Sequence, residues 1–315
     1  MRDTSLRQAI VARLGPSTPK VPLDLEQDRE TDQGDHIRAL VTCAVEPGER
    51  VPAWLLRPKG SAPRGGWPGI LAIHQHGGEF DLGKSEPAGL SANRMFHYGL
   101  DLCRRGYVVL CPDLLCFEDR RPPEAVRRAN PYQDGYAYER FEFTRRILMG
   151  TCLQTKYLHD LVCALDVLAG LPDINSARLG VIGNSLGGQE ALWLTWYDDR
   201  VRAAVSSCGF GLIRTILRDG INHNFALYVP DLLKICDLDA LVADLAPRPF
   251  MLTAGTEDRL FPIDGVRAIV ERAVEAYTRE QALERFRALI FPGGHAFPDD
   301  VKAEAYAFLD RWLSL

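Results

Sequence analysis

The sequence predicts an α/β fold with a mostly parallel central sheet and helices on both faces. Short apolar runs rich in β-branched residues alternate with longer segments whose apolar residues recur at helical spacing. Strands that are apolar throughout are typical of a parallel sheet covered on both sides. The chain has 315 residues, of which 46% are hydrophobic. This size fits one large domain with insertions better than two small domains.

The expected elements follow one another in a regular order. Two strand-like runs, 36–45 and 51–58, flank a turn at 46–49 and predict an N-terminal antiparallel hairpin at the sheet edge. The expected buried strands are 69–74, 107–113, 177–183, 201–208, 248–255 and 286–291, and the expected helices are 92–105, 157–168, 263–278 and 301–313. Residues 1–35 are polar, with a weak helical pattern over 6–14, and are interpreted as an N-terminal extension lying on the domain 36–315.

Two stretches, 114–150 and 209–240, interrupt this alternation. The first is charged and aromatic, and the second contains the sequence Asn-His-Asn-Phe at 222–225. Both follow the C-terminal ends of expected strands, where open α/β sheets bind ligands. We therefore expect them to be insertions that form a cap over the site, with ordinary surface decoration as the alternative.

Composition and charge exclude several functions. The net charge is −5, and the basic residues gather only in short pairs, which does not fit a nucleic-acid-binding protein. No apolar run approaches the roughly 20 residues that span a bilayer, and the first eight residues lack the apolar core of a secretory signal. The eight cysteines are scattered without Cys-x-x-Cys spacing, as expected for reduced, buried side chains. A cytoplasmic enzyme is the simplest interpretation.

The segment 179–188, with the sequence LGVIGNSLGG, predicts a strand followed by a sharp turn and a helix. This is the context of a Gly-x-Ser-x-Gly nucleophile elbow, in which a strained turn holds a serine hydroxyl above the end of the sheet. Ser185 is therefore the candidate nucleophile. A glycine-rich turn whose serine only caps the following helix is the alternative interpretation.

A serine nucleophile needs a base, and the base needs a carboxylate that orients it. Only two histidines follow Ser185 in the chain. His295 comes directly after the last expected strand, where the order Ser, acid, His requires the base, whereas His223 does not. The acid should follow the penultimate strand, which predicts Asp258, with the adjacent Glu257 as the alternative.

A tetrahedral oxyanion needs two backbone N–H donors. Leu186, the residue after the nucleophile, is the first. The second should come from the loop after the strand 69–74, and His76 is favoured over Gly77. His74 and His76 could instead form a metal pair, but no third ligand with zinc-like spacing accompanies them, so no metal is expected.

Taken together, these segments resemble the α/β-hydrolase superfamily over residues 36–315. Within it, they are most similar to the dienelactone hydrolase-like and acetyl xylan esterase-like branch. The segments that carry the resemblance are 74–78, 183–188, 246–249, 255–262 and 293–295. The resemblance implies an α/β-hydrolase fold and a Ser185/Asp258/His295 triad that forms an acyl-enzyme.

The expected function is hydrolysis of a carboxylic ester of a small or medium-sized molecule by a serine hydrolase. No cofactor is required, and the expected partner is the small-molecule ester, with a homo-oligomer left open. Hydrolysis of a carbon–carbon bond or of an amide or peptide bond on the same scaffold is one alternative. A protein that keeps the fold but only binds a ligand is the alternative from another class.

Overall fold

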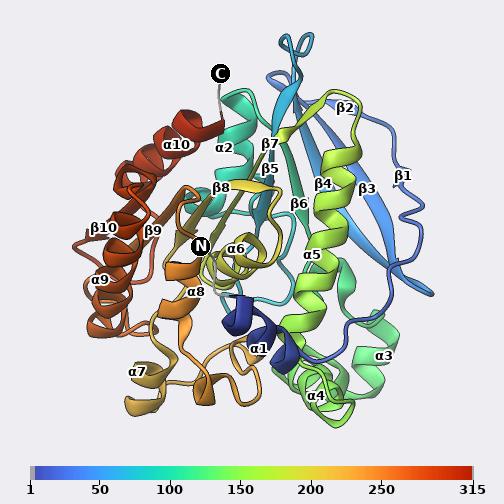
Figure 1. The fold of residues 1–315 in the computed structure, drawn as a ribbon. Helices are drawn as coiled ribbons and strands as arrows, with labels where there is room; N and C mark the ends of the chain where they lie inside the picture. Colours follow the sequence, from blue (N-terminus) through green and yellow to red (C-terminus); the bar gives the residue numbers. More distant parts are fainter. Residues whose placement is uncertain (1–3, 314–315) are drawn as a thin grey trace.

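The computed structural model describes residues 4–313 and contains one ten-stranded sheet (Figure 1). Its strand order is β1-β3-β4-β6-β5-β7-β8-β9-β10, with β2 paired to β3 outside this path. The strands are β1 (Glu26–Gln27), β2 (Thr31–Asp32), β3 (His36–Glu46), β4 (Glu49–Pro58), β5 (Trp67–Ile73), β6 (Val108–Pro112), β7 (Ile174–Asn184), β8 (Val201–Ser207), β9 (Phe250–Gly255) and β10 (Phe286–Phe291).

The sheet is parallel from β6 to β10 and antiparallel at its N-terminal edge. Strands β3 and β4 form the expected hairpin, and β4 then pairs antiparallel with β6. Strands β5, β6, β7, β8, β9 and β10 are joined by parallel ladders only. The mostly parallel fold class is thus confirmed, and the C-terminal ends of six strands share one edge.

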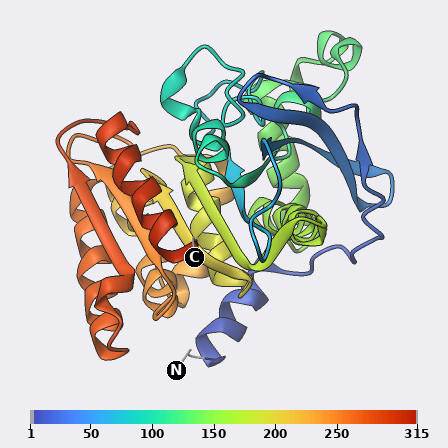
Figure 2. The same cartoon turned by 90° about the horizontal axis from the view of Figure 1, so that it is seen from above.

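Helices cover both faces of this sheet (Figures 1 and 2). On one face, α2 (Tyr98–Arg104) and α10 (Asp299–Leu313) bury their apolar side chains in one core cluster. On the other face, α5 (Leu153–Gly170), α6 (Leu186–Tyr197), α8 (Leu238–Asp244) and α9 (Ile263–Arg279) contribute to a second, larger cluster. The α5 helix is buried along almost its whole length, which matches its mostly apolar sequence.

The expected helix 92–105 is shorter than predicted. The structure has a single 3₁₀ turn, η1 (Arg94–Phe96), and then α2 begins at Tyr98. The side chain of Asn93 accepts a hydrogen bond from the Met95 N–H, which favours a tight local turn over a longer helix. The polar residues of this stretch therefore compete with helix formation, and only the apolar part continues as α2.

The stretches 114–150 and 209–240 carry short helices of their own. The first holds η2 (Glu118–Arg120), α3 (Glu124–Ala129), η3 (Pro131–Gln133) and α4 (Gly135–Leu148), and the second holds α7 (Ile213–Arg218), η4 (Phe225–Leu227), η5 (Leu232–Lys234) and the start of α8. Helices α3, α4 and α7 lie along the same edge of the molecule, at the bottom of Figure 1. The rings of Phe143 and Phe225 stack at 5.2 Å and join the two stretches.

The N-terminal segment is tied into the fold more firmly than a peripheral extension would be. The predicted helix is present as α1 (Thr4–Leu14), and both Ile10 and Leu14 are buried in the larger core cluster. The guanidinium of Arg7 donates to the carbonyl of Trp196. Strands β1 and β2 were not predicted, because they are two residues long, polar and exposed, so no alternation of apolar residues marks them.

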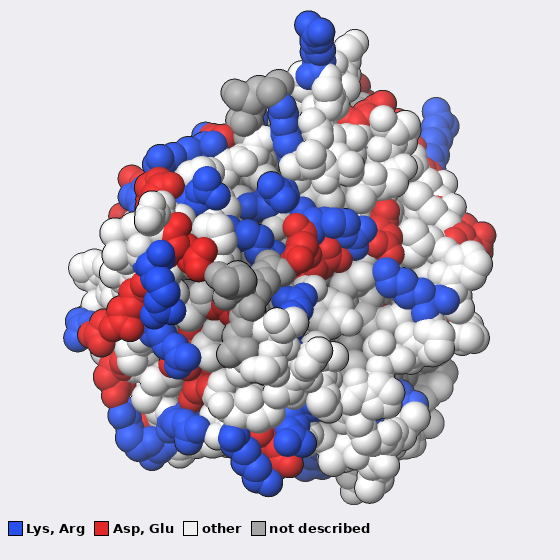
Figure 3. Space-filling view, in the orientation of Figure 1, with Lys and Arg blue, Asp and Glu red and all other residues white. Residues whose placement is uncertain are grey.

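The surface and the cysteines agree with the composition. Positive and negative side chains are intermixed on the face shown in Figure 3. Among the described residues, no helix is long and apolar enough to cross a bilayer. All eight cysteines, which lie within 4–313, are free thiols, and seven of them are buried.

Candidate active site

Ser185 lies on a strained turn between β7 and α6. Its backbone adopts φ 55° and ψ −121°, a region that residues other than glycine rarely occupy. The Ser185 N–H donates to the carbonyl of Ser207 on the neighbouring strand at 2.9 Å, which holds the turn in place. The twelve-residue helix α6 begins directly after it, so the Leu186 N–H lies at the positive end of the helix dipole.

Glycines are required where the strand and the helix of this turn meet. A Cβ on Gly183 would lie 2.2 Å from backbone atoms of Gly187, and a Cβ on Gly187 would lie 2.0 Å from the carbonyl oxygen of Ile73. Both distances are far inside van der Waals contact and involve backbone atoms that cannot rotate away. The Gly-x-Ser-x-Gly pattern is therefore a packing requirement of the elbow.

The substitution Gly187→Ala should destabilise the protein by about 3 kcal/mol or more, because the elbow and β5 must separate to admit the methyl group. The matched control is Gly170→Ala near the end of α5, where an added Cβ meets nothing within 4 Å. We expect that control to be neutral or slightly stabilising. Urea unfolding of both variants measures the difference, and equal unfolding midpoints would contradict the packing argument.

The imidazole of His295 is oriented by Asp258. The ring Nδ1 lies 2.8 Å from the Asp258 Oδ2 atom, and the Asp258 side chain is only 1% exposed. The other oxygen of Asp258 accepts a hydrogen bond from the Leu260 N–H at 2.8 Å. The Nε2 atom of His295 is buried and has no hydrogen-bond partner among the described residues. With Nδ1–H donated to the carboxylate, Nε2 carries the lone pair that can accept a proton.

The carboxylate at the imidazole is that of Asp258. The adjacent Glu257 is exposed, and its N–H donates to the carbonyl of Gly293. A buried thiol, that of Cys208 at the end of β8, also lies beside this pair and faces the carbonyl of Ala296. Burial and the charge of Asp258 raise the pKa of Cys208 to about 12, so the thiol is neutral at physiological pH.

Ser185 and His295 line the same cavity, whose volume is about 710 Å³. It lies at the C-terminal edge of the parallel strands, where ligand sites of α/β sheets are found. Its walls come from the loop after β5 and from both of the stretches that interrupt the alternation. The other lining residues are Gln75, His76, Gly77, Gly78, Tyr136, Asn222, His223, Asn224, Phe225, Tyr228 and Leu260.

The loop after β5 presents its backbone to this cavity. Gly77 and Gly78 have positive φ angles of 55° and 75°, which curl the loop. The Gly78 N–H donates to the His76 Nδ1 atom, and the Glu79 N–H donates to the His76 carbonyl. These bonds leave the N–H groups of His76 and Gly77 as the donors of the loop that can serve an oxyanion.

The rings of His74 and His76 are each committed to other groups. The His74 Nδ1–H donates to the carbonyl of Gln75 and its Nε2 accepts from the Leu114 N–H, while burial lowers the pKa of His74 to about 4. The His76 Nε2 contacts the buried carboxylate of Glu139 on α4 at 2.9 Å. The contact ties the loop to α4, and no pattern in the sequence marks it.

Other clusters of acidic side chains are occupied by protein cations. Asp113, Glu118 and Asp119 form a cluster with metal-like spacing. The ammonium of the buried Lys84 donates to all three of these carboxylates. The ammonium thus occupies the position between these carboxylates that a metal ion would need, and it offsets part of their charge.

His223 lies close to the catalytic candidates, although its position in the chain does not match that of the base. Its ring is 4.7 Å from that of Phe261, which in turn is 5.9 Å from the ring of His295. Burial, and then the charges of His295 and His76, lower the pKa of His223 to about 4. The imidazole is therefore neutral at physiological pH. Sequence order excludes it as the base but gives no hint that it shares the cavity.

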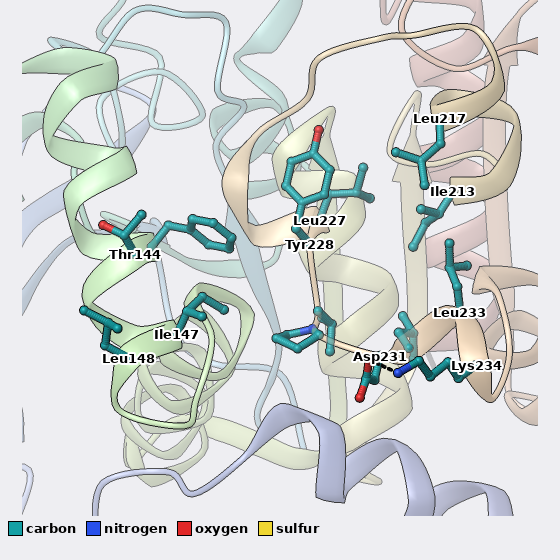
Figure 4. Close-up of a pocket in the computed structure, with 14 residues that line it drawn as sticks. Thr144, Ile147, Leu148, Ile213, Leu217, Leu227, Tyr228, Asp231, Leu233 and Lys234 are labelled. Carbon is teal, nitrogen blue, oxygen red and sulfur yellow. Dashed lines mark ion pairs between the residues drawn. The ribbon is translucent and has the colours of Figure 1, made fainter.

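A second cavity, of about 660 Å³, is shown in Figure 4, and Tyr228 lines both cavities. In the close-up, Thr144, Ile147 and Leu148 of α4 stand on one side, with Ile213 and Leu217 of α7 on the other. Its walls are almost entirely apolar, and the ion pair of Asp231 and Lys234 is at its rim. None of the candidate catalytic residues lines it.

The fold and this site define a member of the α/β-hydrolases. The family model of the dienelactone hydrolase family matches residues 53–314. This range is most of the chain and includes the elbow, Asp258 and His295. The chain therefore belongs to the dienelactone hydrolase family.

Known proteins of similar sequence and structure agree with this assignment. A Bacillus subtilis (strain 168) protein named "Putative hydrolase YtaP" is 30% identical over 312 residues, which cover 98% of each chain. Among solved structures, a Bacteroides fragilis NCTC 9343 protein described as a "putative acetyl xylan esterase" superposes with a TM-score of 0.73 at 16% identity. That match covers 97% of this chain and 80% of the other. A glucuronoyl esterase from Solibacter usitatus superposes with a TM-score of 0.68 at 15% identity, covering 98% and 92%. At such identities the two solved structures show a shared fold.

Proposed function

We propose that this protein is a serine hydrolase that cleaves a carboxylic ester of a small or medium-sized molecule through an acyl-enzyme. His295 accepts the proton of Ser185, whose oxygen attacks the ester carbonyl. The N–H groups of Leu186 and of His76 or Gly77 stabilise the oxyanion. Asp258 stabilises the charge of the imidazolium, which then protonates the leaving alkoxide. Water hydrolyses the acyl-enzyme and releases the acid.

The observation that carries this proposal is the state of the His295 ring. Its Nδ1 is tied to a buried carboxylate, and its Nε2 has no partner in the described chain. It shares a cavity wall with a serine on a strained elbow. A ligand-binding protein without activity would not need an imidazole held with a free lone pair beside a strained serine. The esterase names of the structural neighbours favour esters over amides and carbon–carbon bonds.

Pre-steady-state hydrolysis of p-nitrophenyl acetate tests the acyl-enzyme. We expect a burst of p-nitrophenol close to one equivalent per chain, because acylation by an activated ester outpaces deacylation. A parallel panel of p-nitroanilides and diketones should react far more slowly. Turnover without a burst, together with equal turnover of amides, would contradict the proposed function.

Removal of the side chain that lines both cavities should change the acyl-chain preference. In Tyr228→Ala the apolar cavity becomes accessible from Ser185, and each methylene buried there contributes about 0.8 kcal/mol. We expect the ratio of kcat/KM for p-nitrophenyl octanoate to that for the acetate to rise on the order of tenfold. The control is Leu148→Ala, which alters the second cavity at an 89% exposed side chain but leaves Tyr228 intact. A rise of the same size in the control would contradict this role of Tyr228.

A further inference from the structure

His223 has a hydrogen-bonding environment that dictates where its proton lies. The dictating residue is the neighbouring Asn224, which is itself buried. The Leu227 N–H donates to the Asn224 Oδ1 at 3.2 Å, so this oxygen faces the η4 turn. The Nδ2 group of Asn224 must then point the other way, toward the Gln189 Oε1 at 3.1 Å and the His223 Nδ1 at 2.9 Å. Both of those atoms therefore accept.

Fully buried side chains beneath Asn224 form a row of hydrogen bonds that all run in the same donor-to-acceptor direction. The Gln189 Nε2 donates to the Gln154 Oε1 at 3.0 Å, which leaves the Gln189 Oε1 free to accept from Asn224. The Gln154 Nε2 donates in turn to Glu190 at 2.6 Å. Every amide in this row is thus oriented from both ends. The row extends from α5 through α6 to the loop that carries His223.

The proton of the neutral imidazole must then sit on Nε2. Its Nδ1 accepts from Asn224, and the ring is uncharged because burial lowers its pKa to about 4. The His223 Nε2 atom is buried and has no partner among the residues described. A buried N–H without an acceptor carries a desolvation penalty that a ligand oxygen would relieve. Because His223 lines the cavity of Ser185, the substrate is the group that can supply this oxygen.

We propose that the Nε2–H of His223 forms a substrate subsite that selects neutral esters bearing an acceptor oxygen, such as an ether, hydroxyl or carbonyl oxygen, near the scissile group. This inference rests on the proposed function. No Lys, Arg, Asp or Glu is among the described residues that line the cavity, so a charged substituent would find no counter-ion there. The subsite therefore favours substrates that accept a hydrogen bond and carry no charge.

The tautomer is tested first, without any substrate. Long-range ¹H–¹⁵N correlation spectra of the wild-type chain should show His223 protonated at Nε2 only, at pH 7. In Asn224→Asp the carboxylate replaces the donor with an acceptor, so we expect a proton on Nδ1. Thermal unfolding confirms that the variant is folded. Wild-type spectra with the proton on Nδ1 would overturn the inference.

Matched substrates then test selectivity. The acetates of the tetrahydropyranylmethanols differ from cyclohexylmethyl acetate only in one ring ether oxygen. For the best tetrahydropyranyl isomer we expect wild-type kcat/KM to exceed that for the cyclohexyl ester by about fivefold to tenfold, the effect of one neutral hydrogen bond. His223→Leu should reduce this ratio to near one. His223→Gln, which restores a donor close to the Nε2 position, should recover part of the ratio.

A binding arm separates this inference from the proposed function. Tetrahydropyran and cyclohexane, which contain no ester bond and differ only in one ring ether oxygen, are titrated into the Ser185→Ala chain. Only the first should shift the ¹⁵Nε2 resonance of His223. If the wild type did not hydrolyse esters but the His223 resonance still shifted in the Ser185→Ala titration, the proposed function would be refuted and the subsite retained. An equal ratio in wild type and His223→Leu, or no difference between tetrahydropyran and cyclohexane, would overturn the subsite.

Discussion

Ser185→Ala should lower kcat for p-nitrophenyl acetate by at least about 10⁴-fold, because no other hydroxyl can form the acyl-enzyme. The residual rate should remain above that of the uncatalysed reaction, since the backbone donors of Leu186 and of the loop at His76 are unaffected. The fold should survive, because the Ser185 side chain caps nothing in α6. Steady-state kinetics and thermal unfolding measure the two effects separately.

The matched control for that experiment is Ser206→Ala. Ser206 lies at the end of β8 beside the elbow, and its buried hydroxyl has no partner in the described chain. Removal of this hydroxyl should leave kcat within a few-fold of the wild type. A large loss in Ser206→Ala, or retained burst kinetics in Ser185→Ala, would show that the nucleophile has been misassigned.

Asp258→Asn should lower kcat by about 10⁴-fold with little change in KM. The reason lies in the contacts of the carboxylate. The Leu260 N–H holds one oxygen of Asp258, so an asparagine would keep its oxygen there and turn its NH₂ group toward the His295 Nδ1. The imidazole would then accept at Nδ1 and carry its proton on Nε2. In that tautomer it cannot accept the serine proton.

Glu257→Gln is the control for this substitution. Glu257 is adjacent in sequence but exposed and outside the cavity, so its neutralisation should change kcat less than threefold or so. The pair is measured by kcat at pH 7 and by ¹⁵N spectra of His295. An equal loss of kcat in both variants would contradict the assignment of the orienting carboxylate to Asp258.

The sequence predicted the parallel sheet and the elbow because both depend on local patterns. Strand β9 and the C-terminal half of β7 are mostly apolar and buried, and the glycines around Ser185 mark the turn where backbone meets backbone. The positions of Asp258 and His295 followed from their order after successive strands. The structure then places these two side chains in contact.

What the sequence could not predict depends on contacts between distant segments. The His76–Glu139 bond joins residues 63 positions apart, and no pattern around Glu139 marks it as buried. His223 was excluded as the base by its position, but only the folded chain shows that it shares the cavity with Ser185. Its tautomer depends on Asn224 and on Gln189 of α6, so it follows from tertiary structure alone.

Covalent labelling with a fluorophosphonate tests the central claim most directly. The reagent forms a stable bond only with a serine whose hydroxyl is activated by a base. We predict a mass increase of one label per chain, on the peptide that contains Ser185, which is absent from His295→Ala. Labelling at another residue of an active preparation, or full labelling without the imidazole of His295, would contradict the account.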